Sequence, residues 1–180
     1  MSNRQPGPTY GEIICAEYFI FQEPLCDYHR KILDGTVDAF IKVEQDINSE
    51  CDDKVGGRRK SNEVLSMVRE HLEGNGWEVE HGKRIVVSCG EAKINPDARF
   101  REEKELKAIL EVEGPRAWVA SAWAKDLTKA MKTKQDYLVL AVRKRYTAGS
   151  ATASNDFKRI GEELKQLNDL PINAVLLIGY

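Results

Sequence analysis

The sequence lacks any long apolar segment, and its cysteines and histidines follow no metal-binding pattern. No apolar run approaches the roughly 20 residues that a membrane-spanning helix needs, and none follows a basic signal-peptide start. The four cysteines include no C-x-x-C pair, and the three histidines lie at no ligand spacing. We therefore expect a cytoplasmic protein with no membrane partner and no zinc site.

A strong net charge is also lacking. The chain has 27 basic and 29 acidic side chains, which gives a formal net charge of −2. Such a chain has no overall attraction to nucleic acid, so any binding to DNA would depend on local basic patches. The bulk charge neither supports nor excludes DNA as a partner.

Length and composition describe one globular domain. With 180 residues, of which 42% are hydrophobic and 31% charged, the chain can bury a substantial core but is short for two domains. The hydrophobic periodicity predicts the following order: a helix over 28–48, a helix over 61–72, strands over 77–80 and 84–88, an acidic hairpin, a helix over 119–134, a strand over 137–142, a helix over 155–168 and a strand over 172–178. This order predicts an α/β fold, a central mixed β-sheet with helices on both faces.

Three carboxylates are expected to meet on the hairpin. Glu111 and Glu113 project to the same side of their strand, with Cα atoms roughly 7 Å apart. If the polar segment 101–105 forms the tip and the fold-back centres on Lys104, Asp97 lies directly opposite Glu111. Grouped carboxylates repel one another unless a cation neutralises them, and Mg²⁺ prefers oxygen ligands. The pattern therefore predicts a metal site at Asp97, Glu111 and Glu113; the alternative is an exposed acidic strand face.

This pattern resembles the PD-(D/E)XK nuclease superfamily. Pro96-Asp97 followed by Glu111-Val112-Glu113 is similar to its Glu-x-Glu variant, found in type II restriction enzymes of the BamHI and BglII kind. The segments ILEVEG, AKDLTKAMK, DYLVLAV and AVLLIGY also resemble, in the same order, elements of uncharacterised bacterial proteins. The resemblance covers residues 61–180 and implies a restriction endonuclease-like core, with residues 1–60 as an N-terminal extension, a flexible start plus a helix, packed on it.

The resemblance implies a metal-dependent DNA endonuclease that hydrolyses phosphodiester bonds with Mg²⁺ or Mn²⁺. Asp97 and Glu111 would bind the metal, while Glu113, in the place of the superfamily lysine, would accept a proton from water or bind a second metal. Glu63 would complete the site, or it simply favours the helix N-terminus on which it lies. A homodimer is expected, because cutting both strands of a duplex needs two active sites.

Two alternatives to a DNA endonuclease remain open. Since the lysine is missing, the chain could be a non-catalytic nuclease-fold protein that binds nucleic acid or another partner. It could also be a nuclease that acts on RNA or branched DNA. Lys125, from the following helix, could also take the place of the missing motif lysine.

Basic side chains provide candidate phosphate contacts in three places. Lys125, Lys129 and Lys132 share one face of the helix over 119–134. The remaining candidates form two runs, Arg58-Arg59-Lys60 and Arg143-Lys144-Arg145. A solvated basic surface explains each of these groups as well.

Overall fold

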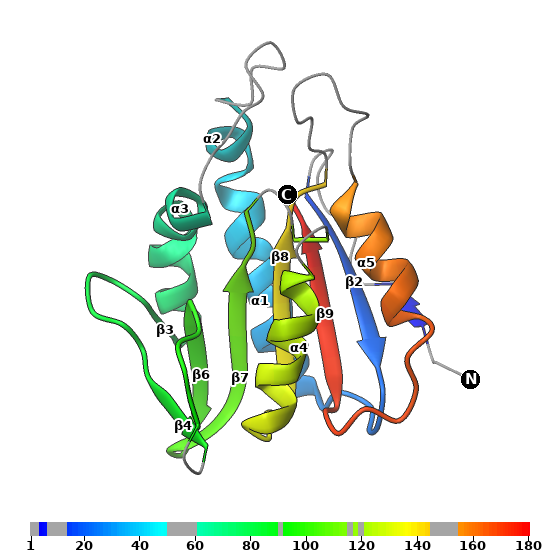
Figure 1. Ribbon diagram of the computed structural model, residues 1–180. Coiled ribbons are helices and arrows are strands. Elements are labelled where there is room, and N and C mark those ends of the chain that lie inside the picture. The colour runs from blue at the N-terminus through cyan, green and yellow to red at the C-terminus, as the bar shows by residue number, and fades with distance from the viewer. Residues whose placement is uncertain are drawn as a thin grey trace.

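The computed structural model arranges helices on both sides of a β-sheet (Figure 1). It describes residues 4–6, 14–49, 61–89, 92–114, 117–118, 121–144 and 155–180. Arg58, Arg59, Lys60 and Arg145, which were predicted to contact phosphates, lie outside the described residues.

A mixed sheet of seven strands forms the middle layer. Its strands, in their order across the sheet, are β1 (Arg4–Pro6), β2 (Cys15–Ile20), β9 (Ala174–Gly179), β8 (Tyr137–Val142), β7 (Glu105–Val112), β6 (Ala98–Glu102) and β3 (Trp77–Val79). The neighbours β7, β8 and β9 are parallel, and the other pairs are antiparallel. β8 and β9 are buried at every position, as their continuous apolar sequences require. A separate hairpin pairs β4 (Val87–Cys89) with β5 (Ala92–Ile94).

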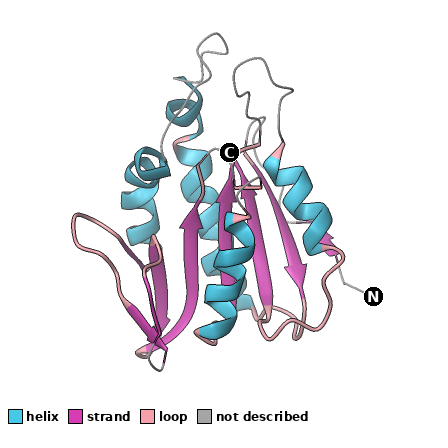
Figure 2. Ribbon diagram, viewed as in Figure 1, coloured by secondary structure: helices cyan, strands magenta, loops and turns pink. Residues whose placement is uncertain are grey.

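Helices cover the two faces of the sheet (Figure 2). One face packs against α1 (Asp27–Lys42), α2 (Glu44–Ser49) and α3 (Ser61–Gly74), and the other against α4 (Ala122–Lys132) and α5 (Asp156–Leu164). Alternate residues of β7 divide between the two cores: Leu110 packs on the α1 and α3 side, and Ile109 packs on the α4 and α5 side. The predicted α/β class, a mixed sheet with helices on both faces, is confirmed at this level, although several element ends differ from the predicted ones by a few residues.

The described part of the N-terminal segment contributes a strand as well as helices. β2 pairs with β9 over residues 15–20 and so belongs to the main sheet. The helix expected over 28–48 is interrupted at Val43, where the backbone leaves the helical conformation and separates α1 from α2. None of the helices in the described part of the chain is long and apolar enough to cross a membrane.

Two polar contacts join α1 to the segment that follows α3, that is, to the turn residue Asn75 and to Trp77 of β3. The buried Trp77 indole N–H donates to Thr36 Oγ1 at 2.9 Å, and Asn75 Nδ2 donates to the carbonyl oxygen of Gly35 at 2.6 Å. A Cβ atom at Gly35 would lie 3.1 Å from the Asn75 amide, so this close approach favours glycine. These contacts place α1 and α3 side by side on one face of the sheet.

Candidate active site

The β6–β7 hairpin brings Asp97 next to Glu111. Ala98 pairs with Leu110, so the next pair in this register is Asp97 with Glu111. Asp97 Oδ2 also accepts a hydrogen bond of 2.7 Å from the backbone N–H of Val112. The predicted opposition of the two acids is therefore supported by the register, and Asp97 additionally satisfies a backbone donor at the end of the strand.

Glu111 and Glu113 lie on the α4 side of the sheet, because Leu110 and Val112 pack into the core on the opposite side. Glu111 is buried, with 5% of its surface exposed, and Glu113 is half-buried. The backbone of Glu113 is fixed from two sides: its N–H donates to Ala141, and its carbonyl oxygen accepts from the Tyr180 hydroxyl at 2.6 Å. The two side chains are thus held at the carboxyl end of β7.

α4 adds an acid and a cation to these side chains. The ammonium of Lys129 lies 3.0 Å from Glu111 Oε1 and 2.6 Å from Asp126 Oδ1. Asp126 is only 2% exposed, and its second oxygen, Oδ2, has no hydrogen-bond partner among the described residues. The Glu113 carboxyl lies near that of Asp126 and interacts with it. Two ionised carboxylates cannot hydrogen-bond to each other, so this contact needs a proton or a cation between them.

The four carboxylates, Asp97, Glu111, Glu113 and Asp126, form what we call the acidic cluster. Burial raises the pKa of Asp97 to about 6, assisted by the charges of Glu80 and Asp126. Burial and the charge of Asp126 raise the pKa of Glu111 to about 8 against the opposing effect of Lys129. Burial, followed by the contact with Asp126, raises the pKa of Glu113 to about 8.

Lys129 is the internal counter-ion of the cluster. Burial alone would lower the pKa of its ammonium, but the hydrogen bonds and charges of Asp126 and Glu111 outweigh that effect and raise it. The residue is therefore positively charged throughout the physiological range, and it offsets part of the repulsion between the acids.

The donor set of the acidic cluster suits a hard divalent cation. Among the described residues, no three Asp, Glu, His or Cys side chains are arranged as a complete metal-binding group. Mg²⁺ nevertheless binds through one or two carboxylates and completes its shell with water and substrate phosphate. The buried Asp126 Oδ2, which has no donor, and the neighbouring carboxyl of Glu113 provide such a pair.

Glu63 lies on the other side of the sheet, in the first turn of α3. The start of this helix does approach the end of β7, since a Cβ atom at Gly114 would lie 3.9 Å from the backbone nitrogen of Ser61. Glu63 is exposed and is not among the groups that perturb the pKa values of Asp97, Glu111 or Glu113. Its predicted contribution to the site remains a prediction.

The structure separates the predicted phosphate-binding residues. Lys125 and Lys132 are exposed on α4, whereas Lys129 turns toward Glu111 and Asp126. The three lysines therefore do not form the single basic face that was expected. Lys129 follows Asp126 by three positions, so the two side chains are neighbours on the helix and Lys129 pairs with this acid. Arg143 is 5% exposed and contacts Tyr180. Its side chain is therefore not exposed in this structure, whereas Lys144 is partly exposed, and the phosphate contacts expected of both remain predictions.

The sequence analysis did not identify Asp126. A signal was present: this acid directly precedes the buried Leu127 and lies one turn before the buried Ala130, within the apolar side of α4. An acidic side chain at such a position is buried only with a partner. The spacing to Lys129 could have indicated that partner.

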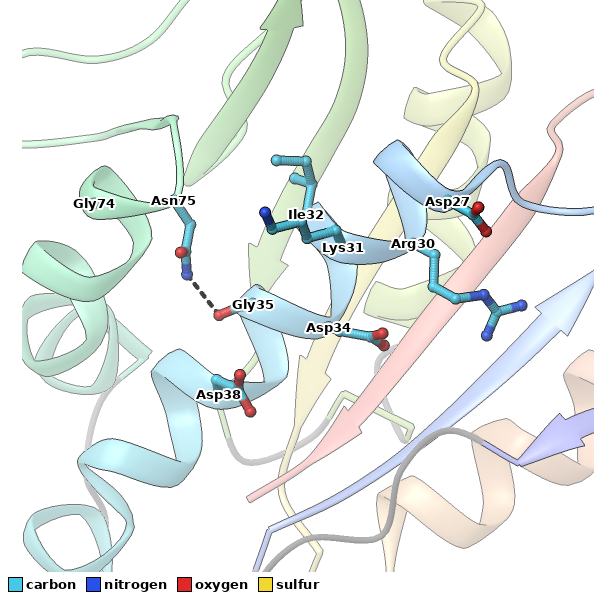
Figure 3. Close-up of a pocket in the computed structure, with 9 residues that line it drawn as sticks. All are labelled: Asp27, Arg30, Lys31, Ile32, Asp34, Gly35, Asp38, Gly74 and Asn75. Atoms are coloured by element: carbon cyan, nitrogen blue, oxygen red, sulfur yellow. Dashed lines mark hydrogen bonds between the residues drawn. The ribbon is translucent and has the colours of Figure 1, made fainter.

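A hollow of about 560 Å³ lies along the outer side of α1, apart from the acidic cluster. Asp34 and Arg30 line it (Figure 3), and both contact Tyr18: Asp34 accepts from its hydroxyl, and the Arg30 guanidinium lies over its ring. α1 covers the opposite face of the sheet from α4. The hollow therefore takes no part in the candidate active site.

No model of a known protein family matches the sequence, and comparison with curated proteins finds no match.

Proposed function

We propose that the protein is a Mg²⁺-dependent endonuclease of the restriction endonuclease-like fold, acting on DNA. The observation that carries the proposal is the acidic cluster, in which buried carboxylates from a hairpin and a helix converge although they repel one another. A purely structural site gains little from such an arrangement. The order α3, β3, β6, β7, α4, β8 supports the fold assignment, because it is the order that the resemblance implies.

Asp97, Glu111, Glu113 and Asp126 are the residues that would hold the metal. When bound, Mg²⁺ would neutralise phosphate charge and make a water nucleophilic near neutral pH. Lys129 would supply a fixed positive charge beside the scissile phosphate. It would thus take the role of the PD-(D/E)XK lysine that Glu113 replaces in this sequence. Glu113 is only half-buried and can therefore exchange a proton with a water at the site.

Plasmid cleavage tests the proposal. Supercoiled DNA should be nicked or linearised in Mg²⁺ or Mn²⁺ but not in EDTA, and Glu111→Gln should be inactive. Glu162→Gln, which changes an exposed acid on α5, is the matched control and should keep full activity. Equal cleavage by the two variants would show that the activity does not arise at the acidic cluster. We propose a homodimer as the cleaving species, which gel filtration with light scattering would test.

A second candidate function is a non-catalytic nucleic-acid-binding module. One observation favours it: Lys129 already pairs with Glu111 and Asp126 and offsets part of their charge from within the protein. Glu113→Ala separates the two candidates, since an endonuclease should lose cleavage but keep gel-shift binding. Glu113→Lys should be inactive as well, because its positive charge would disrupt a second-metal site built around the Glu113 carboxylate. Wild-type protein that binds DNA but never cuts duplex, branched or RNA substrates with either metal would establish the binding module.

A further inference from the structure

A cysteine, a histidine and a glutamate form a connected group at the end of the sheet opposite the acidic cluster. They come from three places in the chain: Cys26 is the N-cap of α1, His29 lies in its first turn, and Glu102 lies at the tip of the β6–β7 hairpin. The group adjoins Tyr137 at the start of β8, on the α1 side of the sheet, whereas Glu111 of the acidic cluster is level with Leu140 and projects to the α4 side. The three residues from Tyr137 to Leu140, at about 3.3 Å each, separate the two sites by roughly 10 Å along the strand, and the sheet lies between them.

The distances connect the three side chains in series. Cys26 Sγ lies 3.1 Å from His29 Nδ1, and His29 Nε2 lies 3.2 Å from Glu102 Oε2. A carboxylate accepts hydrogen bonds, so Glu102 places the imidazole proton on Nε2 and leaves the lone pair of Nδ1 facing Cys26. This is the order nucleophile, base and orienting acid that activates cysteine in enzymes of unrelated folds.

The thiol is accessible and lies at the N-terminus of α1. Cys26 is an exposed free cysteine, and its sulfur accepts a hydrogen bond from the backbone N–H of His29 at the start of α1. The partial positive charge of a helix N-terminus stabilises negative charge on sulfur. The His29 side chain is only 16% exposed, and its ring packs at 5.0 Å from the Tyr137 ring, so the base is held in place.

We propose that Cys26 is a nucleophilic thiol that reacts with small uncharged electrophiles, peroxides in particular, with His29 as its base and Glu102 as a positioning residue. With hydrogen peroxide, an S–O bond forms as the O–O bond breaks. The thiol proton passes through His29 Nδ1 to the departing hydroxide, so the products are the sulfenic acid of Cys26 and water. Sulfur is oxidised by two electrons and the peroxide is reduced by two, and no other reactant is needed.

Charge selects the class of reagent. Asp27 adjoins Cys26 in the chain, and a hollow beside Glu102 is also lined by Glu103, Glu105 and Lys107. Lys107 is paired with Glu105, so the acids outnumber this cation. These acids repel anions, which favours a neutral peroxide over an anionic disulfide or carboxylate reagent.

Replacing Tyr137 tests the proposal through an expected increase in the reaction rate of Cys26. Its hydroxyl lies 2.8 Å from the same His29 Nδ1 and donates to the lone pair that the thiol needs. Removing this competitor with Tyr137→Phe should make His29 more available and raise the rate at Cys26 about twofold to threefold, as expected for one hydrogen bond shared between two donors. A rate increase that came only from looser packing around Cys26 would not depend on His29.

The experiment uses the full chain, hydrogen peroxide with dimedone trapping, and mass spectrometry that resolves each cysteine. His29→Gln should slow sulfenic acid formation at Cys26 by tenfold or more, as general-base catalysis predicts, while His71→Gln on α3 should leave it unchanged. The half-buried Cys15, whose pKa is raised by burial, is the internal reference and should not respond to either variant. At Cys26, the ratio of the reaction rate with iodoacetamide to that with the anionic iodoacetate should be much higher in the folded protein than in the urea-unfolded chain.

Glu102→Gln tests the positioning role. It should lower the rate at Cys26, and long-range ¹H–¹⁵N spectra should show the Nε2–H tautomer of His29 in the wild type and a mixture in the variant. Circular dichroism establishes that each variant is folded. An unchanged rate in folded His29→Gln, or equal losses in His29→Gln and Tyr137→Phe, would overturn the proposal. If His29→Gln does not fold, a rate lowered by Tyr137→Phe would overturn it instead.

Discussion

The metal-free protein should become less stable as the pH rises from 5 to 8, and Glu111→Gln should remove much of that loss. Burial and the charge of Asp126 raise the pKa of Glu111 from 4.5 to about 8. Between these values the folded protein holds a proton that the unfolded chain has released. The folded state then binds more protons than the unfolded state, so the free energy of unfolding falls as the pH increases.

The magnitude follows from proton linkage. One additional proton in the folded state changes the free energy of unfolding by about 1.4 kcal/mol per pH unit, so the three units from pH 5 to 8 correspond to at most about 4 kcal/mol. Glu111 and Glu113 both interact with Asp126, so we expect the cluster as a whole to lose about this amount rather than twice as much. Glutamine resembles the protonated acid, so Glu111→Gln should match the wild type at pH 5 and exceed its stability at pH 8.

Urea unfolding in EDTA at pH 5, 6, 7 and 8 measures this dependence. Glu162→Gln, the exposed control, should follow the wild-type curve at every pH. At pH 8, Mg²⁺ should then raise the melting temperature of the wild type more than that of Glu111→Gln, because only the intact cluster binds it well. A wild-type stability that stays level or rises from pH 5 to 8 would refute the assignment of repelling, partly protonated carboxylates.

Three further predictions concern α4. Lys129→Met should lower stability by about 2 kcal/mol at pH 8 and by less at pH 5, where the acids can take up protons, as urea unfolding would measure. Asp126→Asn gives Glu113 a hydrogen-bond donor, so the metal-free protein should be at least as stable as wild type, while the Mg²⁺-induced rise in melting temperature shrinks; an undiminished rise would exclude Asp126 as a ligand. Lys125→Gln combined with Lys132→Gln should weaken gel-shift binding of all DNA sequences and flatten its salt dependence without altering stability by more than about 0.5 kcal/mol; sequence-dependent losses would contradict phosphate contact.

The pairing of Asp97 with Glu111 could be predicted from the sequence, but the turn assumed for that prediction differs from the observed one. The expected fold-back centred on Lys104, whereas the turn consists of Glu103 and Lys104, both with positive φ, and joins Glu102 to Glu105. That turn alone would place Asp97 one residue out of register. A β-bulge between Phe100 and Arg101 shifts the pairing by one residue and restores the expected opposition of Asp97 and Glu111. Neither the bulge nor the compensation has a clear sequence signal.

The contribution of α4 to the site could not be predicted in the same way. Strand alternation fixes the side on which Glu111 projects, because its period is two residues. Which lysine of α4 meets Glu111 depends on how far the helix is rotated against the sheet, and that rotation is set by the packing of Leu127 and Ala130. The sequence therefore predicted a basic face containing Lys125, Lys129 and Lys132, while packing brings Lys129 to Glu111.

Lys129 also explains how the fold tolerates the acidic cluster before any metal binds. Its ammonium contacts Glu111 and Asp126, the two most buried acids of the cluster, whereas Asp126 Oδ2 has no hydrogen-bond partner among the described residues. Glu113 and Asp126 would hold a divalent cation, and Lys129, which contacts Asp126, would compete with that cation for the same carboxylate. Lys129→Met should accordingly tighten Mg²⁺ binding in isothermal titration calorimetry while lowering cleavage. If the variant instead bound Mg²⁺ more weakly, Lys129 would be organising the carboxylates rather than competing for them.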